Sequence, residues 1–226
     1  MTDTSDTQLL RAFSDPSQAL DPRIIEHFDA NLMRYEAKQV IYHAGAEPDC
    51  VYCLKRGLVK LVSYLPNGQS RIVRLHNAGA WFGLGRVLDE PCEHTAVAVE
   101  DIELYRIEAT RLKRLRDELP EVYCLLMECW YDYLRRADKW IAEFSTGSLK
   151  SRLARLLNFL GEIEMELDSD QIKLLTCEEM AEILGTTPES VSRLLAEMKR
   201  QQVLKPLADD NRYRCDMEQL ETLAED

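Results

Sequence analysis

The sequence has no run of about 18 apolar residues, the length that a membrane-spanning helix needs. Its first residues lack a basic segment followed by an apolar core, so no secretory signal is expected. The seven cysteines are odd in number and scattered, whereas a secreted disulfide scaffold is shorter and evenly paired. We therefore expect a soluble cytoplasmic protein with reduced thiols and no membrane partner.

Enzymatic and metal-binding motifs are also missing. The 226 residues contain no glycine-rich phosphate loop, no nucleophile motif and no carboxylates with metal spacing, so we expect no catalytic residues and no metal site. Cys50 and Cys53 form a suggestive pair, but residues three apart on a β-strand point to opposite faces, which favours packing. Cys92, Cys124 and Cys129 remain candidates for a thiol switch.

The chain has no surplus of positive charge, which is the usual mark of a protein that binds nucleic acid indiscriminately. The formal net charge is −12, and acidic residues outnumber basic ones 23 to 18 up to Ser145 and 17 to 10 after it. A local basic surface is still open, because three basic residues face two acidic ones between Thr186 and Gln202. Any contact with nucleic acid is therefore expected to be specific and salt-sensitive.

Short β-rich runs separated by glycine turns fill the chain from Met33 to Ile107, after a short helix expected at 22–28. Many strands at intervals of roughly 8 to 12 residues are typical of an antiparallel barrel or sandwich. Beyond residue 108 the pattern becomes helical, and helices are predicted at 111–119, 121–144 and 149–163. A three-helix region to about Val203 and a short hairpin complete the chain.

The long predicted helix at 121–144 carries an apolar stripe, which either joins two copies of the chain or covers the β-domain of its own subunit. We favour a homodimer. The stripe consists of Val122, Leu126, Cys129, Tyr133, Ala137, Trp140 and Phe144.

Two short helices joined by a glycine turn are predicted from Leu175 onward. Thr176 with Glu179 three residues later forms a capping box, and Gly185 ends the first helix. Thr187 caps the second helix, whose first residue is Pro188. This is the geometry in which a second helix enters the major groove of DNA.

Glu189, Ser192 and Arg193 face outward on the second helix if Val191, Leu194, Leu195 and Met198 face inward. Arg can donate to guanine, Glu can accept from cytosine, and Ser suits either edge. The alternative is an ordinary helical hairpin in which Glu189 and Arg193 form an i, i+4 ion pair.

From about Ile24 onward the sequence resembles the CRP/FNR family of bacterial transcription regulators. The resemblance rests on Gly45, the blocks at 51–57 and 79–83, the hairpin at 67–68, and the E-x-x-S-R pattern of Glu189, Ser192 and Arg193. It implies an α+β chain with a β jelly-roll sensor domain at 1–108, a short helix and a long dimerisation helix at 109–144, and a winged helix-turn-helix at 145–226. It further implies palindromic DNA with TTGAT-like half-sites and RNA polymerase as a partner.

By the same resemblance, residues 203–215 form the wing and several side chains contact the DNA backbone. Ser145–Ser148 would be the hinge about which an effector rotates the DNA-binding domains until the recognition helices lie about 34 Å apart. The expected backbone contacts are Thr176, Thr187, Lys199, Arg200, Lys205, Arg212 and Arg214.

The resemblance places a candidate effector pocket at Gly83, Leu84, His94 and Thr95, where cyclic AMP-binding members hold their ligand. Leu84 cannot accept hydrogen bonds from a ribose, and His94 is mostly neutral where the family has a permanent cation. The family's adenine-contacting Thr-Ser pair corresponds to Ala137 and Asp138, so cyclic AMP is not expected.

Other cofactors of the family are not expected either. Residues 1–49 contain no cysteine, which excludes the FNR type of iron-sulfur cluster, and 81–86 contain neither the cysteine nor the histidine of haem-binding members. Control is therefore expected through another effector or through redox state. The alternative is a regulatory protein-interaction module with a degenerate DNA-binding domain, which the acidic C-terminal domain supports.

Overall fold

A computed structural model describes residues 28–118, 120–163, 170–208 and 211–225. The described residues form two compact units, the first built from 28–68 and 73–135 and the second from 69–72 and 136–225. The division falls inside helix α4 (Pro120–Ser145), between Arg135 and Arg136, and so precedes the expected boundary at Ser145. The helix expected at 22–28 lies almost wholly outside the described residues.

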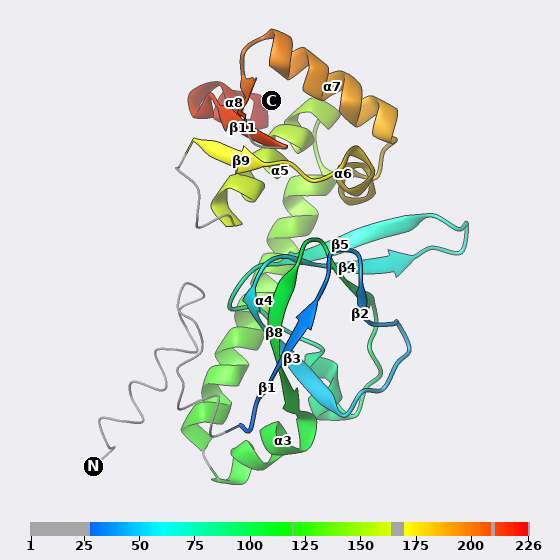
Figure 1. Cartoon of the computed structure of the whole chain (residues 1–226), viewed down its shortest axis with the longest axis vertical. Coiled ribbons are helices and arrows are strands. Elements are labelled where there is room, and N and C mark those ends of the chain that lie inside the picture. The colour runs from blue at the N-terminus through cyan, green and yellow to red at the C-terminus, as the bar shows by residue number, and fades with distance from the viewer. Residues whose placement is uncertain (1–27, 119, 164–169, 209–210, 226) are drawn as a thin grey trace. The chain divides into compact units, whose positions relative to one another are not determined.

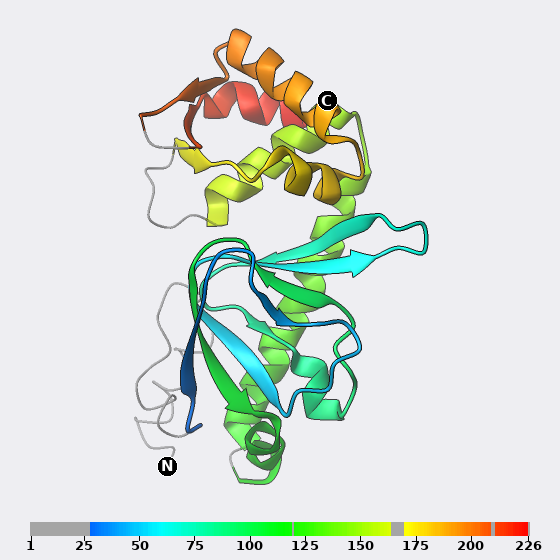
Figure 2. The same ribbon diagram turned by 45° about the vertical axis from the view of Figure 1, so that its right-hand side comes forward.

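The first unit contains two four-stranded antiparallel sheets, with strand orders β1-β8-β3-β6 and β2-β7-β4-β5. Their strands surround a common interior (Figure 2). This arrangement confirms the predicted antiparallel β domain. The strands are β1 (Asn31–Tyr35), β2 (Val40–Tyr42), β3 (Cys50–Arg56), β4 (Val59–Tyr64), β5 (Ser70–His76), β6 (Trp81–Phe82), β7 (Thr95–Ala98) and β8 (Ile102–Glu108).

Strand β3 is buried on both faces, and its side chains alternate between two cores. Val51 and Cys53 pack in a cluster that includes Leu112 of helix α3 (Ala109–Glu118). Cys50, Tyr52 and Leu54 belong to the core between the two sheets. Cys50 and Cys53 therefore lie on opposite faces of the strand, as their spacing predicts, and each is a packing residue.

The second unit is built around α5 (Leu149–Ile163), which has the predicted bounds and contacts α6, α8 and β9 (Figure 1). Strand β9 and helix α8 are absent from the sequence-based prediction. None of the helices in the described ranges is long and apolar enough to cross a membrane. The remaining elements are β9 (Gln171–Lys173), α6 (Cys177–Leu184), α7 (Pro188–Arg200), β10 (Leu204–Pro206), β11 (Arg212–Cys215) and α8 (Met217–Glu225), with the three strands in the antiparallel order β10-β11-β9.

The turn between β3 and β4 requires a glycine, and this requirement can be tested. Gly57 has φ of 93°, and a Cβ there would lie 2.8 Å from Cγ2 of Ile102 and 2.9 Å from the carbonyl oxygen of Asp101. We expect Gly57→Ala to lower the free energy of unfolding by more than about 2 kcal/mol, because the left-handed conformation and the clash both oppose a side chain.

Gly45→Ala is the matched control for thermal or urea unfolding. Gly45 has φ of 79°, but a Cβ there would meet nothing within 4 Å. Its cost should be the conformational one alone, about 1 kcal/mol. Equal losses for the two variants would show that the Ile102 contact does not matter.

Candidate nucleic-acid interface

Helix α6 begins with the predicted capping box. The Oγ1 atom of Thr176 accepts a hydrogen bond from the main-chain N–H of Glu179 at 3.2 Å, and the Glu179 carboxylate accepts one from the N–H of Thr176 at 3.1 Å. Gly185 ends the helix in the left-handed conformation, with φ of 63°. The local sequence thus fixes both ends of the helix that precedes α7.

Helix α7 begins at Pro188, and the hydroxyl of Thr187 accepts a hydrogen bond from the N–H of Ser190 at 3.3 Å. Its inward side is apolar, as predicted, with Val191, Leu195 and Met198 buried and Leu194 half-buried. The opposite side exposes Glu189, Ser192 and Arg193.

The carboxylate of Glu189 is held in its ionised form. Hydrogen bonds from its own main-chain N–H and from the Thr187 hydroxyl lower the pKa of this exposed group below its usual value. An ionised carboxylate only accepts hydrogen bonds. Glu189 therefore presents an acceptor at the N-terminal end of α7, beside the donor side chain of Arg193.

Lys199 joins α7 to the β10–β11 hairpin. Its ammonium donates to the hydroxyl of Tyr213 at 2.8 Å and lies 4.5 Å from the centre of the ring. This contact is not predictable from the sequence, because the two residues lie in different elements and share no local pattern. Lys199 was expected at the DNA backbone, and the structure gives it a second role in positioning the wing.

The other residues expected to contact the DNA backbone differ in their exposure and in the bonds that they already form within the chain. Arg200 and Lys205 are exposed, whereas Arg212 is half-buried. Arg214 forms an ion pair with Asp170 at 3.0 Å. The hydroxyls of Thr176 and Thr187 already cap α6 and α7, so Arg200 and Lys205 are the side chains best placed to meet phosphate.

Two protein families match the two units. Residues 32–118 match the Cyclic nucleotide-binding domain family, and residues 151–223 match the Crp-like helix-turn-helix domain family. The chain belongs to the CRP/FNR family of transcription regulators. Among its relatives, the transcriptional regulator LdrP of Thermus thermophilus is 29% identical over 75% of this chain and 85% of its own length.

Two further members show the breadth of this likeness. The cAMP-activated global transcriptional regulator CRP of Haemophilus influenzae is 24% identical over 77% of this chain and 80% of its own. The crystal structure of a CRP-family transcriptional regulator from Thermus thermophilus, TTHB099, has a TM-score of 0.74 and 27% identity. The match covers 86% of this chain and 97% of that one.

The candidate effector pocket of this CRP/FNR protein is not a single polar site. A Cβ on Gly83 would lie 3.4 Å from the Tyr52 ring, and Leu84 packs on a different core, that of Val51. The hydroxyl of Thr95 accepts a hydrogen bond from the N–H of Ala44 at 3.1 Å. His94 is half-buried. Gly83 and Leu84 thus serve packing, and only His94 and Thr95 bring polar side chains to the candidate pocket.

A stack of aromatic rings that the sequence analysis did not predict joins the β interior to α4. Tyr52 stacks on Phe82 with ring centres 5.3 Å apart, Phe82 on His76 at 5.4 Å, and His76 on Tyr133 of α4 at 5.9 Å. Cζ of Arg74 lies 3.9 Å from the centre of the Tyr133 ring, and Nη1 of Arg74 donates to the main-chain carbonyl oxygen of Tyr133 at 2.9 Å. Burial raises the pKa of Tyr133 and keeps it neutral.

Three residues of the predicted dimer stripe on α4 have aromatic contacts within their own chain. Tyr133 packs on His76, while Trp140 and Phe144 meet edge to face with ring centres 4.7 Å apart and both contact Phe159 of α5. These residues cover their own chain, and Ala137 on the same side is half-buried. The side chains of Val122, Leu126 and Cys129 lie outside the described part of the chain.

The apolar side chains that α4 does expose lie on another face. Tyr131, Leu134 and Ile141 are 69%, 62% and 62% exposed, which leaves enough apolar area for a partner helix. Exposed Cys124 and half-buried Met127 continue the same spacing of three and four residues. These five residues form what we call the outer stripe.

The buried thiol of Cys215 should be chemically inert. Burial, followed by the nearby negative charge of Asp170, raises the pKa of Cys215 to about 12. Since the thiolate is the nucleophile, we expect iodoacetamide to modify Cys215 in the native protein at least about tenfold more slowly than half-buried Cys177, which lies outside the outer stripe, near neutral pH.

Peptide mass spectrometry over a time course measures both alkylation rates in one sample. Unfolding in urea is the control and should make the two rates similar. Comparable rates in the native protein would contradict the burial of Cys215.

Proposed function

We propose that this CRP/FNR regulator binds a palindromic DNA site as a homodimer and reads TTGAT-like half-sites with α7. The proposal rests on helix α7, which is capped by Thr187 and exposes Glu189, Ser192 and Arg193 near its N-terminal end. The N-terminal residues of a recognition helix are those that reach base edges in the major groove.

Each exposed side chain has a chemical partner on a base edge. The guanidinium of Arg193 can donate two hydrogen bonds to guanine, and the ionised carboxylate of Glu189 can accept one from the amino group of cytosine. Ser192 can serve either kind of edge. Arg200 and Lys205 contact phosphate on either side and set the register of the helix on the duplex.

The outer stripe of α4 provides the dimer contact. Cys124 and Tyr131 are seven residues apart, as are Met127, Leu134 and Ile141, which is the a/d pattern of a two-stranded coiled coil. Three of these side chains are more than 60% exposed in the single chain. Pairing with a second copy removes this apolar surface from water.

The β domain responds to an effector other than cyclic AMP or to redox state. Leu84 has no polar side-chain group and packs on a core, and the hydroxyl of Thr95 already accepts a hydrogen bond from the N–H of Ala44. Bound at a promoter, the dimer would meet RNA polymerase.

We expect Arg193→Ala to remove most of the preference for the palindrome over unrelated DNA. One bidentate contact to guanine contributes about 1–3 kcal/mol of discrimination, so the specificity ratio should fall about tenfold or more at each half-site. Fluorescence anisotropy with both duplexes over a range of salt concentrations measures it, and added cyclic AMP should change neither affinity.

Lys205→Ala is the control for Arg193→Ala, because an exposed phosphate contact carries no sequence information. It should weaken binding to both duplexes alike and lower the salt slope by about one for each subunit, or about two for the dimer. An Arg193→Ala protein with unchanged preference would overturn the role of this residue. A wild-type protein with no preference at all would favour the protein-interaction module.

Leu134→Asp should convert the dimer to monomers and abolish binding to the palindrome, because a charge would then be buried in the coiled coil. Arg136→Asp is the matched control, since it changes a neighbouring exposed residue outside the outer stripe. Sedimentation velocity gives the oligomeric state. A Leu134→Asp dimer that binds DNA normally would refute the assignment of the stripe.

A further inference from the structure

The turn at Ser145–Ser148 between α4 and α5 has the composition of a hinge, but its main-chain carbonyl groups are held by one side chain. Nη1 of Arg155 donates to the carbonyl oxygen of Glu143 at 2.8 Å and to that of Thr146 at 2.9 Å. Nε of the same guanidinium donates to the carbonyl oxygen of Ala224, at the end of α8, at 2.8 Å. One arginine thus links the ends of two helices and the turn between α4 and α5.

These carbonyl groups are natural sites for a cation. The last carbonyls of a helix have no partner within the helix and carry the negative end of its dipole. A planar guanidinium holds its donors in a fixed fork, so binding several acceptors restricts its orientation more than an ammonium would. Arg155 therefore restrains both α4 and α8 relative to α5.

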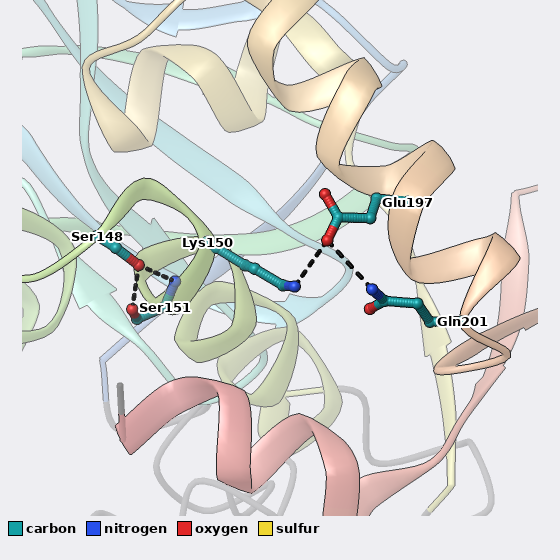
Figure 3. A network of polar contacts seen from close by, with 5 residues as sticks. All are labelled: Ser148, Lys150, Ser151, Glu197 and Gln201. Carbon is teal, nitrogen blue, oxygen red and sulfur yellow. Dashed lines mark hydrogen bonds and ion pairs between the residues drawn. The ribbon is translucent and has the colours of Figure 1, made fainter.

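The turn is adapted to this arginine. Gly147 has φ of 86°, and a Cβ there would lie 2.8 Å from Nη2 of Arg155. Ser148 caps α5 by accepting a hydrogen bond from the N–H of Ser151 at 3.1 Å (Figure 3). The rings of Phe144 and Phe159 meet across the turn, with centres 5.9 Å apart.

Helix α5 is also tied to α7. Lys150, in the first turn of α5, forms an ion pair with Glu197 of α7 at 2.7 Å, and Gln201 donates to the same carboxylate oxygen at 3.2 Å (Figure 3). The ion pair lowers the pKa of Glu197, which keeps this carboxylate charged. The side chains of both Lys150 and Glu197 are about one third exposed.

We propose that Arg155 and the Lys150–Glu197 pair make the Ser145–Ser148 turn a rigid corner, which fixes α7 relative to the last turns of α4. All of these contacts lie within the part of the second unit that follows Arg135. The three residues are positioning residues for DNA reading, and this role rests on the proposed function of α7. Rotation about the expected hinge at Ser145–Ser148 would have to break the contacts of Arg155.

Arg155→Met in the full chain tests the corner with two measurements. Hydrogen exchange followed by mass spectrometry should show amides at 143–149 exchanging about tenfold faster or more, while amides in α6 keep their rates, because only the local restraint is lost. Affinity for the palindrome should fall about tenfold, whereas affinity for a duplex with a single half-site should change by less than about twofold. Binding to the palindrome needs both α7 helices of the dimer in the correct position, whereas binding to a single half-site needs only one.

The result would differ if Arg155 only stabilised the fold. General destabilisation would speed exchange throughout the second unit and weaken both duplexes alike. Arg136→Met is the control for the loss of one positive charge, because Arg136 is exposed in the same unit, and it should leave exchange at 143–149 unchanged. Unchanged exchange and an unchanged ratio of affinities in Arg155→Met would overturn the proposal.

Two further variants cover the case in which Arg155→Met does not fold. Ending the chain after Thr222 removes the Ala224 carbonyl. It should speed amide exchange at 143–149 and lower the ratio of palindrome to half-site affinity, both by less than Arg155→Met does. Glu197→Lys should lower the ratio of palindrome to half-site affinity, and Lys150→Glu added to it should restore the ratio. If wild-type protein bound no palindrome, the proposed function would fail, while the exchange measurement would still decide whether the corner is rigid.

Discussion

The main-chain groups that helices leave unpaired at their ends constrain the second unit more than any other feature. Thr176 and Thr187 satisfy the N–H groups where α6 and α7 begin. Arg152 donates to the carbonyl oxygen of Leu184 where α6 ends, and Arg155 does the same for α4 and α8. The two arginines also join α5 to α4, α6 and α8, the helices whose ends they bind.

The first unit depends on a different constraint, the burial of β3 on both faces. Alternate side chains enter separate cores, and the core between the sheets contains the aromatic residues Tyr42, Tyr52 and Phe82. The ring stack that starts there reaches α4 through His76 and Tyr133. The packed rings therefore connect the β interior directly to α4.

Local signals predicted much of this fold, whereas long-range contacts were not predictable from the sequence. The caps at Thr176 and Thr187 and the bounds of α5 follow from short sequence patterns, which is why the helix-turn-helix could be located. Periodicity identified an apolar face of α4 but could not show that Phe159 and His76 cover it. The roles of Arg155 and Tyr213 depend on partners in other elements, for which one sequence holds no signal.

The distribution of charge has a consequence for how such a regulator finds its site. With a net charge of −12 and few cations on and beside α7, the protein gains little from phosphate attraction alone. It would leave random DNA quickly and spend most of its search in free solution rather than sliding along the duplex. Occupancy of a promoter would then depend on the lifetime of the correctly docked complex.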